Sequence, residues 1–221
     1  MQNFKRLKKT LIYENNDFLV INKPTNISFH NQQDNLGIHS RIQTQLGFNI
    51  WPVHRLDNIT SGLLIFAKSQ HVAGELGKMF EQRAINKIYI ALSDTKPKKK
   101  QGNIIGDMKK SRGGSWKLTQ TKENPAKTHF LSRSLVPGIR LFWITPKTGK
   151  THQIRVALKS IGSPILGDKR YSGTRADRGY LHAYRLSFVW RDKPIKIECL
   201  PQSGEYFRLK ELSKLLNFFS Q

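Results

Sequence analysis

The stretch from His54 to Ala67 constrains the fold most, because it joins a polar segment directly to an apolar run. Pro52 disfavours helical backbone in the residue before it, so the chain enters this stretch extended. Residues 62–67 are short, apolar and partly β-branched, which is typical of a buried strand. We therefore predict a polar loop containing Asp57 at the end of a core strand. Such loops often hold functional residues, although the same residue types also form ordinary turns.

The charge of the chain points to a polyanionic partner. Among 221 residues there are 38 Lys and Arg against 15 Asp and Glu, a formal charge of +23. A charge run usually marks a solvated face, but an excess over the whole chain indicates nucleic acid. An anionic membrane surface is the alternative, and no basic amphipathic helix supports it. The chain also lacks the run of about 18 apolar residues that a spanning helix needs.

The single cysteine, Cys199, cannot form an internal disulfide, which favours a reducing compartment. It lies in an alternating segment, 195–200, and is expected to be a small buried hydrophobic residue. Residues 1–10 are basic but lack the apolar segment of a signal peptide. We therefore expect a cytoplasmic protein with a basic N-terminal arm at 1–10 and one folded domain at 11–221.

Apolar periodicity and turn residues predict helices alternating with hairpins. The expected strands are 11–13 and 18–22, 62–67, 87–92, 128–135 and 139–145, and 181–190 and 195–200. The expected helices are 36–46, 69–83, 151–161 and 205–219, with Ser69 as the N-cap of the second and loop at 164–171. This order argues for an α+β domain built on a largely antiparallel sheet.

Residues 96–117 form a basic and poorly apolar stretch within this domain. We expect at best a pair of short strands joined by mobile loops. A solvated surface insertion would explain the composition. The large positive charge favours an arm that contacts phosphates, through Lys98, Lys99 and Lys100.

Several motifs together resemble the RluA-like family of pseudouridine synthases. The longest is HRLDNITSGLL at 54–64, and the others follow in the order expected for that family. They are NKP at 22–24, KIYIA at 87–91, PAKT at 125–128, TGKTHQIR at 148–155, PILGD at 164–168 and LHA at 181–183. The resemblance covers roughly residues 11–201.

The resemblance implies the pseudouridine synthase fold, a mixed and mainly antiparallel central sheet with flanking helices and a catalytic cleft. Many relatives have a further N-terminal RNA-binding domain, and we expect none here. The family usually has glycine two residues after the proline of NKP, where this chain has Asn26. Asparagine is the residue that best tolerates left-handed backbone after glycine, so the turn can persist.

The resemblance also assigns catalytic residues. Asp57 would be the essential aspartate, as a nucleophile or as a group that stabilises an electron-poor sugar carbon. Tyr89 would stack on uracil and accept a proton, although a core tyrosine is the simpler reading of a strand position. Arg155 would make a bidentate pair with Asp57, unless it is a surface arginine.

The remaining candidates surround these three. Ile154 and Leu158 are expected to wall the uracil pocket, because a target base must leave its stack to react. Arg55 is a candidate to contact the gap or a flanking phosphate. The other candidates near Asp57 are His54, Leu56 and Thr60, and the candidates for the RNA backbone include Lys147, Lys150 and Lys169.

Isomerisation of uridine gains and loses no atoms, so the resemblance implies no cofactor and no metal. The sequence has no P-loop, no GxGxxG after a strand and no Cys/His metal spacing. The predicted function is a monomeric pseudouridine synthase acting on structured ribosomal or transfer RNA. A non-catalytic RNA-binding or ribosome-assembly protein on the same fold is the alternative. A DNA-binding module is disfavoured, because no helix-turn-helix, zinc-finger or basic-zipper pattern occurs.

Overall fold

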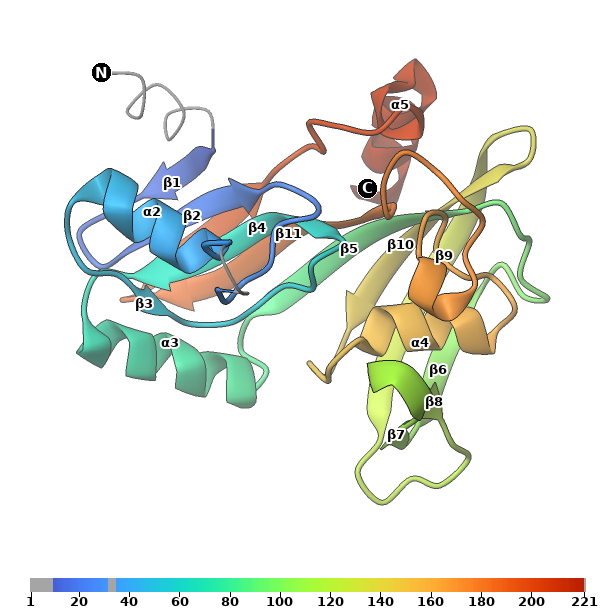
Figure 1. The fold of residues 1–221 in the computed structure, drawn as a ribbon, viewed down its shortest axis with the longest axis horizontal. Coiled ribbons are helices and arrows are strands. Elements are labelled where there is room, and N and C mark those ends of the chain that lie inside the picture. Colours follow the sequence, from blue (N-terminus) through green and yellow to red (C-terminus); the bar gives the residue numbers. More distant parts are fainter. Residues whose placement is uncertain (1–9, 32–34, 221) are drawn as a thin grey trace. The chain divides into compact units, whose positions relative to one another are not determined.

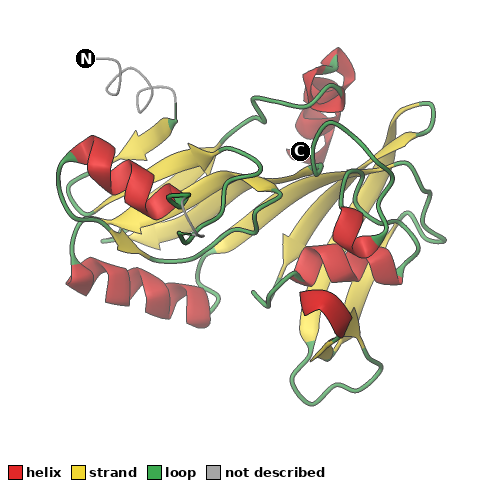
Figure 2. Ribbon diagram, viewed as in Figure 1, coloured by secondary structure: helices red, strands yellow, loops and turns green. Residues whose placement is uncertain are grey.

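The computed structural model describes residues 10–31 and 35–220, so the expected basic arm lies, except for Thr10, outside the described residues. The chain forms two compact units. Unit 1 comprises Met1–Asn86 and Ala183–Leu200, and unit 2 comprises Lys87–His182 and Pro201–Gln221. Each unit combines helices with strands (Figures 1 and 2), which confirms the predicted α+β class.

The strands of unit 1 follow the order β1-β2-β4-β11, with β3 paired to β4 and β12 to β11. The pairs β1–β2, β2–β4, β3–β4 and β11–β12 are all antiparallel. The bounds are β1 Leu11–Glu14, β2 Phe18–Lys23, β3 Trp51–Pro52, β4 Thr60–Ala67, β11 Leu181–Trp190 and β12 Lys193–Glu198. The predicted hairpins, β1–β2 and β11–β12, are therefore confirmed.

Helices α2 (Ile38–Leu46) and α3 (Gln70–Glu81) explain why β2 and β4 are buried along their whole lengths. Successive strand residues face opposite sides of a sheet. On one side, Val20 and Ile65 belong to a core cluster that includes Leu76 of α3. On the other, the Phe66 ring packs 5.8 Å from His39 of α2. A sheet covered on both faces requires the continuous apolar run that the sequence shows.

The helix ends follow ordinary capping chemistry. Ser69 Oγ accepts a hydrogen bond from the backbone N–H of Val72 at 3.2 Å, as expected for an N-cap. Gly47 ends α2 with a φ of 74°, in the left-handed region that favours glycine.

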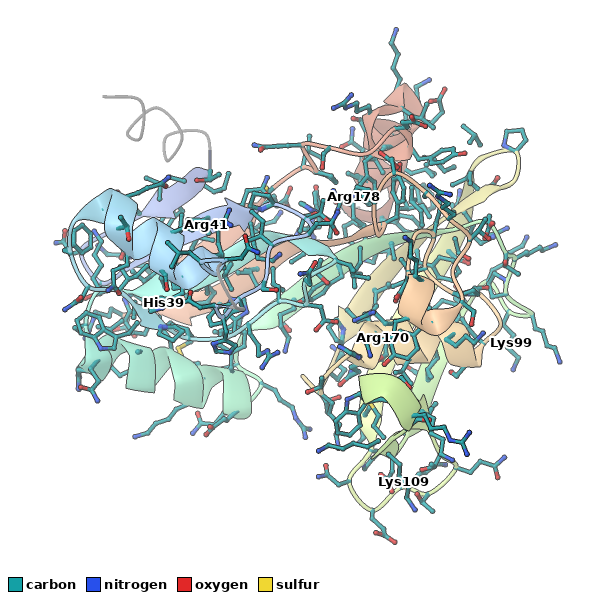
Figure 3. All side chains as sticks on the ribbon, viewed as in Figure 1. His39, Arg41, Lys99, Lys109, Arg170 and Arg178 are labelled. Carbon is teal, nitrogen blue, oxygen red and sulfur yellow. The ribbon has the colours of Figure 1, made fainter. Side chains whose placement is uncertain are left out.

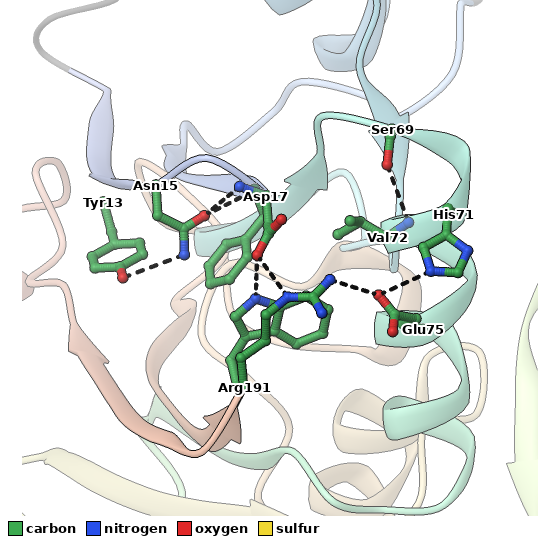
Figure 4. Close-up of polar contacts among 10 residues, drawn as sticks. Tyr13, Asn15, Asp17, Ser69, His71, Val72, Glu75 and Arg191 are labelled. Carbon is green, nitrogen blue, oxygen red and sulfur yellow. Dashed lines mark hydrogen bonds and ion pairs between the residues drawn. The ribbon is translucent and has the colours of Figure 1, made fainter.

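A polar network joins three segments of unit 1 (Figure 4). The Asp17 carboxylate accepts hydrogen bonds from Trp190 Nε1 at 2.7 Å and from Arg191 Nε at 3.2 Å. Arg191 also pairs with Glu75 of α3 through Nη2 at 3.3 Å. Asp17 therefore links the β1–β2 turn to the end of β11 and, through Arg191, to α3.

The strands of unit 2 follow the order β5-β10-β9-β6, and the pairs β5–β10, β9–β10 and β6–β9 are antiparallel. Strands β7 and β8 form a separate hairpin. The bounds are β5 Asn86–Ser93, β6 Gln101–Gly106, β7 Met108–Lys110, β8 Trp116–Leu118, β9 Ala126–Val136 and β10 Ile139–Pro146. Helices α4 (Gln153–Ser160) and α5 (Lys210–Ser220) complete the unit.

The register of unit 2 places α4 and α5 against opposite faces of its sheet. Tyr89 lies opposite Ile144, and the neighbouring pair, Ile90 and Trp143, projects from the other face. Phe219 of α5 stacks on Trp143 at 5.5 Å between ring centroids. Gln153 of α4 donates to Thr128 Oγ1 at 3.0 Å, on the face of Tyr89.

Three expectations need correction. Residues 96–117 hold one strand more than expected: β7–β8 is a pair of short strands, and β6 in addition pairs with β9 along six residues. The last helix begins at Lys210, since extended backbone at Leu209 separates it from a short 3-10 turn, Tyr206–Arg208. The predicted loop at 164–171 ends in a 3-10 turn, Lys169–Tyr171. Within the described residues, no helix is long and apolar enough to span a membrane.

Candidate active site

The loop of unit 1 that holds Asp57 is braced by a neighbouring loop, residues 23–28. The Asn26 N–H donates to the Asn58 carbonyl at 2.8 Å, and Thr25 Oγ1 donates to the Ile59 carbonyl at 2.8 Å. Within the Asp57 loop itself, the Thr60 N–H donates to the Asp57 carbonyl at 3.0 Å. The backbone on the C-terminal side of Asp57 is thus held at consecutive carbonyls, which presents the carboxylate from a fixed turn.

Lys23 also joins the two loops, although no role was predicted for it from the sequence. Its side chain is fully buried, and its ammonium donates to the Pro24 and Ile27 carbonyls at 2.9 and 2.8 Å and to the Asn58 carbonyl at 3.4 Å. A buried ammonium requires such acceptors. Lys23 lies in the NKP motif at 22–24, and this motif is the sequence feature that could have indicated its role.

Asn26 adopts a φ of 59°, so the left-handed turn persists without the usual glycine. At the start of β4, Gly62 has a φ of 111°, and a Cβ there would lie 2.3 Å from the Ala183 carbonyl oxygen of β11. Only glycine permits this close approach of two strands. Both positions fix the ends of the segments around Asp57.

His54 has a packing role in unit 1. Its Nε2 accepts a hydrogen bond from the Ile65 N–H at 3.0 Å, and its ring stacks on Phe80 at 4.6 Å. Leu56 and Thr60 are buried, and their contact with the substrate stays a prediction. Arg55 is exposed and remains a candidate for RNA contact.

In unit 2, Arg155 is buried in a bidentate ion pair, which rules out the surface alternative. Its Nε and Nη2 donate to the two carboxylate oxygens of Asp168 at 2.7 and 2.8 Å. The bidentate carboxylate seen within unit 2 is Asp168, whereas the sequence analysis expected Asp57 in this role. A contact of Arg155 with Asp57 stays a prediction. Asp168 lies within the PILGD motif, which was noted without a role for its aspartate.

The Tyr171 side chain supports Arg155 and its neighbourhood. The Arg155 guanidinium lies 4.8 Å from the centroid of the Tyr171 ring, a cation–π contact. The Tyr171 hydroxyl is 2.8 Å from His152 Nδ1 and accepts a hydrogen bond from the Trp116 N–H at 3.0 Å. Arg170 donates to the Gly113 carbonyl beside it. The β7–β8 hairpin is therefore fastened to the segment that orients Arg155.

Gln153 holds the loop that leads into α4. Its Oε1 accepts hydrogen bonds from Thr148 Oγ1 at 2.7 Å and from the Lys150 N–H at 3.0 Å. Its Nε2 donates to the Lys127 carbonyl at 3.2 Å. No role was predicted for Gln153 either, although it lies inside the TGKTHQIR motif.

The other expected residues of unit 2 lie as follows. Tyr89 is half-buried in β5, and Ile154 is nearly buried at the start of α4. Leu158 is fully buried, and its place in the wall of a uracil pocket stays a prediction. Lys150 donates to the Asn124 carbonyl. The remaining lysines are exposed: Lys98, Lys99, Lys100, Lys147 and Lys169. Figure 3 labels Lys99, before β6, and Lys109, in β7.

No three His, Cys, Asp or Glu side chains gather as a metal site among residues 10–31 and 35–220.

Comparison with known proteins identifies the family of the chain. The family described as RNA pseudouridylate synthase matches residues 17–160, more than half of the chain. The chain belongs to this family. Asp57, Tyr89 and Arg155 all lie inside the matched range.

Relatives within the pseudouridine synthases fall into two groups. An uncharacterised RNA pseudouridine synthase of Haemophilus influenzae is 50% identical over 89% of this chain and 89% of its own length. Ribosomal large subunit pseudouridine synthase C of Buchnera aphidicola is 33% identical over 92% of this chain and 70% of its own. The chain spans only 57% of the enzyme of that name from Rickettsia bellii.

Solved structures confirm the pseudouridine synthase fold. Human RNA pseudouridylate synthase domain containing 1 superposes with a TM-score of 0.77 at 22% identity, over 96% of this chain and 94% of that one. Human RNA pseudouridylate synthase domain containing 4 gives the same TM-score over 96% of this chain and 97% of that one. At this identity the likeness concerns the fold alone.

Proposed function

We propose that this pseudouridine synthase isomerises specific uridines of ribosomal or transfer RNA, with Asp57 as its essential catalytic residue. Membership of the family makes the chain an isomerase that acts on RNA. The observation that supports the choice of Asp57 is its loop, which Lys23, Thr25 and Asn26 hold at the carbonyls that follow it. A carboxylate on a fixed turn is preorganised for a reacting sugar.

The reaction breaks the bond between the sugar C1′ and the uracil N1 and forms a bond between C1′ and C5. The proton on C5 is lost to solvent, and N1 gains a proton, so the composition of the RNA is unchanged. The Asp57 carboxylate either attacks C1′ or assists elimination to a glycal, and both routes require it ionised. A phenol at Tyr89 is suited to accept the C5 proton.

Arg155 serves this chemistry as a fixed positive charge. Asp168 and the Tyr171 ring orient its guanidinium before any substrate arrives. Orientation in advance lowers the cost of reorganisation in the transition state. In this proposal Arg155 is catalytic, and Asp168 and Tyr171 are positioning residues that act through it.

Ribosomal RNA is the first substrate to test. Several relatives carry the name ribosomal large subunit pseudouridine synthase C, at 33–35% identity. The chain covers 55% to 70% of their lengths, so their substrate is transferred here only as a proposal. Action on ribosomal RNA agrees with the formal charge of +23 and with a cytoplasmic location. The expected monomer is also part of the proposal.

The experiment that tests this function measures tritium released from ribosomal RNA labelled at uracil C5. Asp57→Asn keeps the size of the side chain and removes its charge, and should abolish release while RNA affinity stays within a few-fold. Asp94→Asn, at an exposed aspartate, is the matched control and should release tritium at the wild-type rate. Wild-type release from Asp57→Asn would remove Asp57 from the chemistry.

The alternative, a non-catalytic RNA-binding or assembly protein, makes a different prediction. It requires that the wild-type protein binds RNA and releases no tritium from any cellular RNA fraction. Mapping of pseudouridines in ribosomal and transfer RNA from cells with and without the protein decides between the two, and also identifies the modified uridine.

A further inference from the structure

A surface pocket of about 690 Å³ in unit 2 lies at the start of β6, beside β9, β10 and α5. The residues that matter for its chemistry are Lys100, Ser134, Arg133, Arg140, Phe218 and Phe219. The catalytic proposal uses none of these except Lys100, which was expected to contact RNA. The catalytic proposal therefore does not explain this pocket.

Three cationic side chains line this pocket, and none of its lining residues is acidic. Among the described residues, no Asp or Glu pairs with Lys100, Arg133 or Arg140. Arg140 Nη1 donates to Ser132 Oγ at 3.4 Å, which limits the range of its guanidinium. Like charges gathered without counter-charges favour an anion, and guanidinium groups suit phosphate oxygens.

An aromatic platform lies beside these cations. The Arg133 guanidinium lies over the Phe218 ring at 3.5 Å from its centroid, and Phe218 keeps 45% of its surface exposed. Phe219 packs edge-on against Phe218 and stacks on Trp143 of β10. A large exposed ring held by a half-buried neighbour and beside phosphate-binding groups is typical of sites that stack a nucleic-acid base.

The platform faces away from Tyr89 within unit 2. Arg133 lies opposite Leu141 in the β9–β10 pair, and Leu141 and Trp143 project from the face opposite to Ile144 and Tyr89. Helix α5 packs on that same face through Phe219, which stacks on Trp143. Arg140 lies opposite Ser134 and projects from the same face as Ile144, so the cations of the pocket come from both faces of the sheet. A base stacked on Phe218 would nevertheless lie on the face opposite to Tyr89.

We propose that this pocket is a second RNA site, which binds one or two nucleotides of single-stranded RNA outside the target uridine. Arg133, Arg140 and Lys100 bind the phosphates, and Phe218 stacks with a base. An acidic peptide would satisfy the cations but would gain nothing specific from a planar ring. The inference rests on the proposed function in one respect: RNA is the ligand of both sites.

The test uses fluorescently labelled single-stranded oligoadenylate of ten nucleotides and the full chain. Oligoadenylate contains no uridine, so its binding does not depend on catalysis. Phe218→Ala should weaken binding about 5- to 150-fold, the range for loss of one stacked base. Phe218→Trp keeps a planar ring and should bind within about two-fold of the wild type. Because Phe218 is exposed, neither change should unfold the protein.

The arginines are tested by the salt dependence of the same binding. Arg133→Ala with Arg140→Ala should flatten the slope of log affinity against log salt by up to about 1.4, which is two phosphates at about 0.7 each. The control, Lys210→Ala with Lys214→Ala, removes two exposed charges from α5 outside the pocket lining and should leave the slope nearly unchanged. Equal slopes for the two double variants would overturn the proposal.

Two further results separate the possible failures. Displacement of oligoadenylate from the Phe218 site by polyglutamate at equal charge, with tighter binding of the peptide, would overturn an RNA site in favour of a protein partner. Tritium release from uridine-containing RNA by the wild type is measured in parallel. If release is absent while the oligoadenylate results hold, the proposed function fails and the second site stands.

Discussion

At the scale of single residues, the Arg155–Asp168 pair is the most consequential interaction, because both groups are almost fully buried. Asp168→Ala would leave a buried guanidinium without its counter-charge. We expect the free energy of unfolding to fall by about 3–5 kcal/mol, measured by urea denaturation. Glu14→Gln, which breaks the exposed pair with Lys68, is the control and should cost about 0–1 kcal/mol. Equal losses would mean that solvent reaches the Arg155 pair.

The pair also explains what the sequence could not predict at this scale. Arg155 and Asp168 lie 13 residues apart, one in a helix and the other after a loop, and no local periodicity relates them. The motif around Asp57 does not show that Lys23 is buried, since lysine is normally exposed. The left-handed turn at Asn26, by contrast, was predictable from the intrinsic preference of asparagine.

Cys199 yields a second prediction for a single residue. Burial raises the pKa of its thiol to about 12, so the thiol stays protonated and poorly reactive at neutral pH. Iodoacetamide at pH 8 should label the native protein much more slowly than the urea-unfolded protein. Rapid labelling of native protein would contradict the buried position at the end of the β11–β12 hairpin.

At the scale of elements, the Asp17 network should make the stability of unit 1 depend on pH. The hydrogen bond from Trp190, together with Arg191, lowers the pKa of Asp17 below 3.8. A carboxyl with a lowered folded pKa stabilises the fold above its unfolded pKa, and this contribution is lost as pH falls through the folded pKa. The gap in unfolding free energy between wild type and Asp17→Asn should therefore shrink below about pH 4.

The measurement is urea denaturation of both proteins across the acidic range. The control is Asp192→Asn, whose carboxylate lies in the same β11–β12 turn as Arg191 but outside the network of Figure 4. A gap between wild type and Asp17→Asn that is constant with pH would show that Asp17 acts through its shape and not through its charge.

The β7–β8 hairpin gives a second test for an element. Tyr171→Phe keeps the ring under Arg155 but removes the hydroxyl that accepts from the Trp116 N–H. Amide hydrogen exchange in residues 108–118 should become faster, while Arg155 stays in place. Tyr206→Phe, which removes a hydroxyl elsewhere in unit 2, should leave that exchange unchanged. Unchanged exchange in Tyr171→Phe would mean that the hairpin is held by other contacts.

The sequence predicted helices and strands better than it predicted contacts between single residues. Continuous apolar runs located β2 and β4, and Ser69 located the start of α3, because these signals are local. The start of α5 was misplaced by five residues, from 205 to Lys210. There, Tyr206 and Phe207 pack on the Tyr180 ring, and this tertiary contact outweighs helical periodicity. Strand β6 was missed because its apolar content is low and its pairing with β9 is non-local.

At the scale of the whole molecule, the charge of +23 predicts RNA affinity that falls steeply with salt. Replacing Lys98, Lys99 and Lys100 by alanine should flatten the slope of log affinity by up to about 2 units, if each lysine contacts one phosphate. The single-turnover rate on saturated RNA should hardly change, since phosphate contacts position the RNA without reacting. A wild-type slope would redirect the search to Lys147, Lys150, Lys169 and Arg170.

The division of unit 1 between two stretches of sequence has a consequence for protein synthesis. The strands β11 and β12 supply Leu186, Phe188 and Ile197 to the core that Phe18 and Leu63 begin. A ribosome that has made only residues 1–182 has therefore exposed the first half of that core without its covering strands. Contacts between residues so distant in sequence form slowly, and exposed apolar surface invites aggregation. The core of unit 1 can therefore close only after residues 183–200 have left the ribosome.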